Sequence, residues 1–356
     1  MYSYFPRQCF LGANSAHGFH SLYGGFCTAE RGDFLHVIKG GPGCGKSSFM
    51  RRIGSAAEER GHDVKYILCS GDPDSLDGVY IPALGVGYVD GTAPHVIDAA
   101  YPGCSSTYLD LGRFYDSAAL KSRSGEIIEL NRRYKSLYAE AYTRIAAAGE
   151  MLPRRCSGLW GESEREKIRK KVSGLVQREF RSAQGRGRIF ECFLGAVSCK
   201  GGLFLDGSLR ERCDRIYVLD NELGMGNYYL GELLPAAIKR GTDLTVCRDC
   251  LEPGLISGLI FPALSLALIC SDCGADLDTL SCRHIRLDAL VSREELSSRR
   301  TDLRRGRRLG RDCLALATDT LAEAKALHDE LEKVYNPHVD FDGVYAEAEK
   351  HIANLF

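Results

Sequence analysis

The chain has 356 residues, of which 44% are hydrophobic and 26% charged, and its formal net charge at pH 7 is -1. This length favours two domains, and the near-neutral charge disfavours a nucleic-acid partner. No apolar run approaches the roughly 18 residues that span a bilayer, and the first residues do not form a signal peptide. We therefore expect a cytoplasmic protein with no membrane partner.

The first informative segment is a glycine-rich loop between a strand and a helix. An apolar run at residues 34–38 predicts a buried strand, and it leads into Gly40-Gly41-Pro42-Gly43-Cys44-Gly45-Lys46-Ser47-Ser48. Apolar residues then recur at helical spacing from Phe49 to Ala57, and Gly61 stands where a helix cap belongs. Strand, loop and helix in this order form the context that the motif G-x4-G-K-S requires.

This motif predicts that residues 40–48 bind a nucleoside triphosphate. The glycines let successive backbone N–H groups turn toward phosphate oxygens, and the helix amino terminus adds a partial positive charge. Lys46 is expected to reach the β- and γ-phosphates, and the Ser47 hydroxyl is expected to bind Mg²⁺. ATP and Mg²⁺ are therefore the predicted cofactors.

Three aspartates follow the next predicted strand, residues 64–68. In open α/β sheets, ligands bind beyond the carboxyl ends of the strands, so Asp72, Asp74 and Asp77 are placed to face a phosphate, its metal or a cosubstrate. Aspartate is also a common turn residue, so this interpretation leaves one or two of the three as caps. Asp77 is the candidate catalytic residue among them, with Asp72 as an equal alternative.

The next apolar strand, residues 86–89, ends in Asp90. This is the expected form of the aspartate that holds Mg²⁺ in a nucleotide site. His95 follows in a loop and is a candidate general base or phosphate contact, although a loop histidine more often has only a hydrogen-bonding role. Asp90 and His95 therefore join Lys46 and Asp77 as candidate catalytic residues.

Two pairs of segments repeat at long range. The segment 9–13, Cys-Phe-Leu-Gly-Ala, recurs at 192–196, and residues 72–84 align with residues 252–264 at Pro, Gly, Pro, Ala and Leu. Each half then continues with a strand, a loop, a short strand and long helical stretches. The sequence thus predicts an α/β fold made of tandem duplicated P-loop NTPase-like cores, each with three layers, a parallel sheet and an appended helical hairpin. The predicted domains are residues 1–182 and 187–356, and the second copy is degenerate.

The second copy lacks the residues that make the first loop work. In the alignment of the two loops, Asn227 stands in place of the lysine, and Tyr228 in place of the serine after it. Cys270 takes the position of the strand-end aspartate. Asp220 and Glu222 add negative charge that repels phosphate. The second half is therefore predicted not to bind a nucleoside triphosphate in the usual manner.

Four cysteines of the second half have the spacing of a metal site. Cys247, Cys250, Cys270 and Cys273 form two C-x2-C pairs with nineteen residues between them, which is within the range of zinc ribbons. Both pairs follow adjacent predicted strands, so Zn²⁺ is a third candidate cofactor. The chain has 15 cysteines in all, and this abundance favours the alternative of unligated reduced thiols.

Eight arginines crowd residues 293–311. They have the charge to bind nucleic acid, or to supply a transition-state arginine to the intact site across an interdomain cleft. No aromatic residues are interleaved with them, so the pattern favours a solvated helix face.

The segments GGPGCGKSS, CSGDPDSLDGVYIPAL and DGTAPH, together with their weaker repeat, resemble a poorly characterised bacterial family of tandem P-loop ATPase-like proteins. The resemblance covers nearly the whole chain and implies two units of the P-loop NTPase superfamily. Members of that family often keep a lysine in the second loop, and this chain departs from them there.

The sequence therefore predicts Mg-dependent ATP hydrolysis, or γ-phosphoryl transfer, at one site in the first half. Lys46, Ser47 and Asp90 would act by positioning and charge neutralisation. One alternative is a small-molecule or nucleotide kinase that uses Asp72, Asp74 or Asp77 as its base. Another is a non-catalytic, ATP-gated interaction protein. The sequence names no phosphoryl acceptor and no protein partner.

Overall fold

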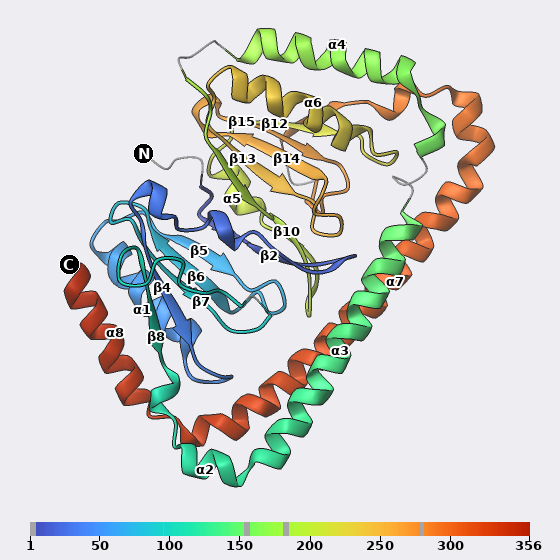
Figure 1. The fold of residues 1–356 in the computed structure, drawn as a ribbon. Coiled ribbons are helices and arrows are strands. Elements are labelled where there is room, and N and C mark those ends of the chain that lie inside the picture. Colours follow the sequence, from blue (N-terminus) through green and yellow to red (C-terminus); the bar gives the residue numbers. More distant parts are fainter. Residues whose placement is uncertain (1–4, 95, 153–156, 181–184, 278–280) are drawn as a thin grey trace.

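The computed structural model describes residues 5–94, 96–152, 157–180, 185–277 and 281–356. It is a mixed α/β protein with two six-stranded sheets, and a long pair of helices runs along both (Figure 1).

The first sheet has the strand order β1-β5-β6-β7-β4-β8. Its strands are β1 (Gln8–Cys9), β4 (Phe34–Lys39), β5 (Lys65–Leu68), β6 (Leu76–Ile81), β7 (Val86–Asp90) and β8 (Ser106–Asp110). Strand β6 is antiparallel to both of its neighbours, whereas all other pairs are parallel. The prediction of a parallel sheet was therefore wrong. Residues 69–75 and 82–85 are too few for the crossover connections that parallel neighbours need, so β6 has to reverse direction.

The second sheet has the order β16-β12-β15-β14-β13-β9, with β14 antiparallel to its neighbours. Its strands are β9 (Ile189–Cys192), β12 (Arg215–Leu219), β13 (Leu244–Arg248), β14 (Ile256–Phe261), β15 (Leu266–Cys270) and β16 (Cys282–Ile285). Two small hairpins accompany the sheets, β2 (Gly12–Ser15) with β3 (Gly18–Ser21) and β10 (Gly195–Ser198) with β11 (Gly201–Phe204). The two units thus have the same strand order and the same directions.

The α-helices of the described residues are α1 (Lys46–Glu59), α2 (Ser117–Ser122), α3 (Ser124–Met151), α4 (Glu162–Glu179), α5 (Asp206–Arg210), α6 (Met225–Lys239), α7 (Arg293–Tyr335) and α8 (Phe341–Leu355). Short 3-10 helices include η1 (Tyr23–Gly25), η2 (Ala29–Arg31), η3 (Gly112–Phe114), η5 (Ser157–Leu159), η6 (Pro262–Leu264), η7 (Asp288–Leu290) and η8 (Asn336–His338). None of the helices in the described ranges combines the length and the apolar character needed to cross a bilayer.

The long helices pair across the two halves and do not form one hairpin in each half, so that prediction was wrong. Helix α3 lies antiparallel to α7 along most of its length (Figure 1). Their shared core includes Leu130 with Leu327, and Ile145 with Leu321. Both helices carry an apolar stripe at 3–4 spacing, and each buries its stripe against the other because such a stripe has to be covered.

The shorter helices α4 and α8 also pack on the opposite unit. Helix α4 follows the first unit in sequence but packs on α6 of the second, where Ile168 and Val172 join the core of that unit. Helix α8 ends the chain but packs on α1 of the first unit, through Val344 and Ile352. Each sheet is therefore covered by helices that come from both halves of the sequence.

The inner faces of the two sheets share one hydrophobic core, so the predicted three layers in each half are not formed. Alternation along β4 shows this, because Val37 belongs to the shared core and Ile38 to the core beneath α1. The ring of Phe5 stacks on that of Phe190 at 3.7 Å. The longer helices α1 and α6 pack on the outer faces, whereas the inner faces meet in the shared core, to which the short helices η1 and α5 also contribute through Tyr23 and Leu209.

Candidate functional site

The glycine loop joins β4 to α1 at the edge where the parallel strands of the first sheet end. Gly43 and Gly45 have φ angles of +68° and +84°, which favour glycine because it lacks a Cβ. Gly45 is the N-cap residue of α1. The loop therefore turns directly onto a helix amino terminus, the part of a helix that attracts anions.

Lys46 folds over this loop toward the neighbouring strand. Its Nζ donates hydrogen bonds to the carbonyl oxygens of Gly40 and Gly41, both at 2.9 Å. It also lies 3.6 Å from Oδ2 of Asp90, and the two side chains are only 13% and 14% exposed. Strands β4 and β7 are parallel neighbours with Ile38 beside Asp90, which explains why the lysine and the aspartate meet.

Ser47 and Asp90 are the two residues that the sequence predicts to bind Mg²⁺. Both offer hard oxygen donors of the kind that Mg²⁺ prefers. The Ser47 Oγ accepts a hydrogen bond from the backbone N–H of Leu76 at 3.0 Å. Asp90 Oδ1 accepts hydrogen bonds from the backbone N–H and the hydroxyl of Thr92, at 2.8 and 2.5 Å. These bonds orient the carboxylate so that Oδ2 faces Lys46.

The three aspartates after β5 have defined partners. Asp77 is buried and accepts a hydrogen bond from the Tyr23 hydroxyl at 3.1 Å. Asp72 Oδ2 lies 3.4 Å from Nζ of Lys325 on α7, and exposed Asp74 pairs with Lys200. Lysines of the second half therefore hold two of the three candidate bases.

His95 lies outside the described residues, so its predicted role stays a prediction.

The carboxyl-terminal end of α7 packs against the glycine loop, which the sequence did not indicate. The Asn336 amide, oriented to satisfy both groups, donates to the carbonyl oxygens of Gly43 and Glu332 at 3.0 and 3.2 Å. The Tyr115 hydroxyl donates to Pro42 O at 3.3 Å, and its ring lies 5.4 Å from that of Tyr335. Asn336-Pro337 is a pattern that typically ends a helix, and it contains no signal for this contact. The loop of the first half is thus contacted by a helix of the second.

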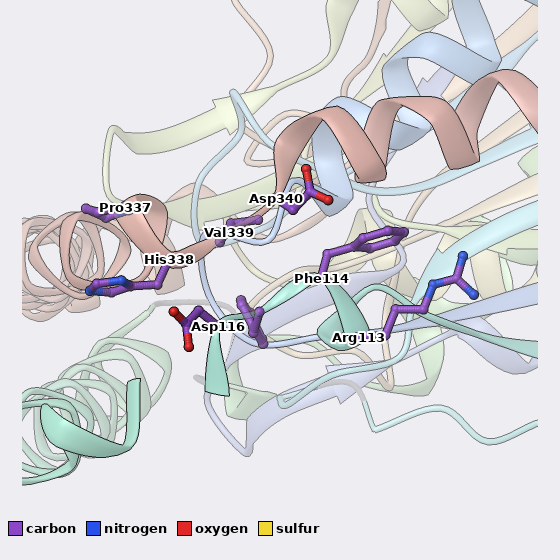
Figure 2. Close-up of a pocket in the computed structure, with 8 residues that line it drawn as sticks. Arg113, Phe114, Asp116, Pro337, His338, Val339 and Asp340 are labelled. Carbon is purple, nitrogen blue, oxygen red and sulfur yellow. The ribbon is translucent and has the colours of Figure 1, made fainter. Parts of the chain in front are cut away.

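A pocket of about 410 Å³ opens beside Tyr115, beyond the carboxyl end of β8. Figure 2 shows the two segments that form it, one before α2 and one leading into α8. Backbone hydrogen bonds tie the segments together, from Asp116 N to His338 O at 2.8 Å and from Asp340 N to Phe114 O at 2.9 Å. The pocket is lined by Arg113, Phe114, Tyr115, Asp116, Pro337, His338, Val339 and Asp340. It therefore adds a hollow with charged and aromatic walls next to the loop.

The second loop is filled by its own side chain, that of Asn221. This side chain is fully buried, accepts from the backbone N–H of Asn227 at 2.9 Å and donates to Asp272 at 2.8 Å. A Cβ on Gly226 would stand only 2.9 Å from its amide oxygen. The space that backbone N–H groups would offer to a phosphate is therefore occupied by an amide.

The structure shifts the alignment of the two loops by one residue. Asn227 and Ser47 stand at the same distance before the capping glycines Gly241 and Gly61, which both have positive φ. Asn227 donates to Ile256 O at 2.9 Å at the start of β14, as Ser47 contacts the start of β6. Asn227 thus corresponds to the serine and not to the lysine. Gly226 takes the place of the lysine, so the ammonium group is still missing.

Acidic residues gather around this second loop. Burial raises the pKa of Asp288 to about 6, and the carboxylates of Asp220 and Glu222 add to the shift. Among the described residues, Asp288 Oδ1 is a buried oxygen without a hydrogen-bond partner. Asp288 thus adds a third carboxyl group to Asp220 and Glu222, of which Glu222 is paired with Arg307 at 3.1 Å, and the repulsion of phosphate stays a prediction.

Asp288→Asn is expected to stabilise the protein near neutral pH. An acid whose pKa is higher in the folded than in the unfolded state stabilises the fold when protonated, and this contribution is lost as the pH rises through the folded pKa. We expect a gain of about 1–2 kcal/mol in the free energy of unfolding near pH 7, and almost none near pH 4. Urea unfolding at both pH values measures it, with exposed Asp319→Asn as the control. An equal gain at both pH values would contradict this explanation.

The structure does not bring the four cysteines of the predicted zinc site together. Cys247 lies beside Cys192 in the sheet, and the Cys270 thiol faces the backbone oxygen of Ile256 at 3.8 Å. Cys250 and Cys273 line a separate small cavity of about 130 Å³. Within the described residues, these four sulfur atoms do not form a group of metal-ligand spacing. The geometry therefore gives no support to zinc.

The arginine run lies on the exposed amino-terminal half of α7, far from the glycine loop. Arg299, Arg304 and Arg308 are all exposed. Even Arg311 is about 20 Å along the helix from Lys325, at 1.5 Å per residue. The run therefore does not reach the glycine loop, and the geometry favours a solvated face on which Arg307 pairs with Glu222 beside the second loop at 3.1 Å.

Comparisons of the chain with protein-family models, with curated proteins and with solved structures found no match.

Proposed function

We propose that the chain is an ATP-binding P-loop NTPase that hydrolyses ATP, or transfers its γ-phosphate, at one Mg-dependent site in its first half. The observation that carries this proposal is the meeting of Lys46 and Asp90, with 3.6 Å between Nζ and Oδ2. Two motifs that the sequence places on different strands converge at one sheet edge, beside a glycine loop and a helix amino terminus. A glycine-rich turn with a chance lysine would not require a strand-end carboxylate at this point.

Each group of the site would have a separate role. The loop N–H groups and the start of α1 would bind the phosphates, and Lys46 would move from the carbonyl oxygens of its loop to the β- and γ-phosphates. Ser47 and Asp90 would hold Mg²⁺, which neutralises charge that develops on the phosphate oxygens. The pocket beside Tyr115 offers room for the nucleoside, with a cation and an aromatic ring in its wall.

The second unit supports the proposal of a single site. Its matching strand order favours an origin by duplication, as does the resemblance to tandem P-loop proteins. Its loop holds Asn221 and faces Asp220, Glu222 and Asp288. We propose that this unit has lost nucleotide binding and acts as a structural partner of the first.

A non-catalytic, ATP-gated interaction protein is the second candidate. It is favoured by the contact of α7 with the loop, because a ligand there would act on a helix pair that spans both units. A kinase receives less support, since Asp72 and Asp74 are paired with lysines and Asp77 with a tyrosine.

The test is calorimetric binding of Mg-ATP to the wild type and to Lys46→Ala. Loss of a charged hydrogen bond is worth about 1.5–3 kcal/mol, so we expect affinity to fall by roughly 10- to 150-fold. The matched control is Lys121→Ala, an exposed lysine on α2. The wild type should bind one ATP per chain. Equal affinity of Lys46→Ala and wild type would show that the site is wrongly assigned, and two ATP per chain would show that the second loop is active.

A further inference from the structure

Helix α7 brings a histidine and a glutamate from the second half to the glycine loop. A Cβ on Gly43 would lie 3.4 Å from both the Cα and the carbonyl oxygen of Glu332, so these two backbones are in contact. His328 lies one turn earlier, with Nδ1 at 3.7 Å from Glu332 Oε1. Its ring lies 5.7 Å from that of Tyr134 on α3. The pair therefore stands where the α3/α7 helix pair faces the loop.

The surroundings of His328 lower the pKa of its imidazole. Burial is the main cause that lowers the pKa of His328, and the ammonium groups of Lys325 and Lys46 lower it as well. The carboxylates of Glu332 and Asp329 act in the opposite direction. The contact of Glu332 with Gly43 places the ring one helical turn from the glycine loop. A neutral imidazole at this point is able to accept a proton.

These side chains do not by themselves define a metal site. His328, Asp329 and Glu332 are the one group in the described residues whose ligand atoms lie within 4.8 Å of one another. They occupy neighbouring turns of a single helix, and Asp329 is paired with Lys325. No second observation indicates an ion there, so we do not identify them as metal ligands.

Among the described residues, the other candidate bases of this half are less suited to the role. Asp90 faces Lys46 and is assigned to Mg²⁺, and the residue after it is glycine. Asp72 is paired with Lys325, and Asp77 is buried against the Tyr23 hydroxyl. His328 lies on α7, outside the sheet, and it is neither assigned to Mg²⁺ nor paired with a lysine.

We propose that His328 is the base that activates the nucleophile at the γ-phosphate, and that Glu332 positions it. This inference rests on the proposed function. Water attacks the γ-phosphorus, the bond from phosphorus to the β,γ-bridging oxygen breaks, and ADP leaves with the electron pair of that bond. The water proton passes to Nε2 of His328 and then to solvent, so the products are ADP, inorganic phosphate and a proton. Nδ1 is turned to Glu332, which stabilises the charged imidazolium.

The experiment compares His328→Gln and Glu332→Gln with the wild type, using Mg-ATP affinity from calorimetry and kcat from phosphate release. We expect His328→Gln to bind Mg-ATP within about threefold of the wild type, with a kcat lower by roughly 10²- to 10⁴-fold. The decrease of kcat at acidic pH, which protonation of His328 would cause, should disappear in this variant. Glu332→Gln should keep part of the activity and shift the pH of that decrease, because its role is positioning. The controls are Glu330→Gln, exposed on the same helix, and His284→Gln, exposed on β16.

The outcomes separate this inference from the proposed function. If the wild type does not bind Mg-ATP, the proposed function itself is wrong. If the wild type turns ATP over and His328→Gln does so at a similar rate, His328 is not the base, although the ATPase assignment stands. Parallel losses of affinity and turnover would also overturn the inference, because they indicate a binding or structural role. Tight binding without any turnover by the wild type would overturn it as well.

Discussion

Val344→Asp is expected to lower the free energy of unfolding by about 3–5 kcal/mol, because it buries a charge without a partner. Val344 is fully buried in the core beneath α1, and its Cγ1 lies 3.5 Å from the position of a Cβ on Gly45. A carboxylate there would be taken out of water beside the glycine loop. Urea unfolding measures the change, and Mg-ATP binding should weaken with it because α8 supports the N-cap of α1.

The control for this variant is Ala346→Asp, which introduces the same charge on the exposed face of α8. Amide hydrogen exchange then locates the effect. Although Val344 belongs to the second half of the sequence, loss of protection is expected in α1 and not in α6. Equal stability of the two variants, or loss of protection confined to α6, would show that α8 does not complete the first unit.

Phe193→Ala is expected to cost about 3–5 kcal/mol, the usual range for removing a buried phenylalanine. Phe193 is fully buried, and its core includes Phe10, Ile38 and Phe49 of the first half. Its backbone exchanges two hydrogen bonds of 2.9 Å with Phe10. The ring therefore packs where the two units meet, and its removal leaves a cavity at that junction.

Denaturant unfolding, followed by fluorescence and by circular dichroism, measures the loss of stability in Phe193→Ala. The matched control is Tyr101→Ala, which removes an aromatic ring that is 55% exposed. We expect the control to stay within about 0.5 kcal/mol of the wild type, as surface substitutions usually do. A loss of less than 1 kcal/mol for Phe193→Ala would show that the junction contributes little.

Together these variants test whether the two halves fold as one body. A boundary between residues 182 and 187 divides the sequence, but α7 and α8 return to the first unit and α4 goes to the second. Each core therefore depends on residues from both halves of the sequence.

The glycine loop could be predicted from the sequence because its motif lies within one short segment. The strand, the glycines, Lys46 and Ser47 are contiguous, and each is required by backbone geometry over a few residues. Asp90 was found by the same logic, as an acid at the end of a buried strand. Their convergence needed one further fact, the parallel pairing of β4 with β7.

Errors arose where long-range pairing decided the outcome. The repeated segments 72–84 and 252–264 contain β6 and β14, but the sequence did not predict these two strands, and their direction depends on how short the connections are. The alignment of Asn227 was wrong by one residue, because a change in loop length leaves no local mark. The Asn221 side chain that fills the second loop was likewise not recognisable until its partners were known.

The sequence alone determined the loop, its lysine, its hydroxyl and the strand-end aspartate, and it led to the prediction of a second, altered copy. Tertiary structure decided that α3 pairs with α7, that α4 and α8 cross to the opposite unit, and that His328 stands beside the loop. The reason is that apolar residues spaced three or four apart show that a helix buries one face. They do not show against which partner that face is buried. Burial of apolar surface has no direction, so only the packing of the whole chain selects among the stripes that are available.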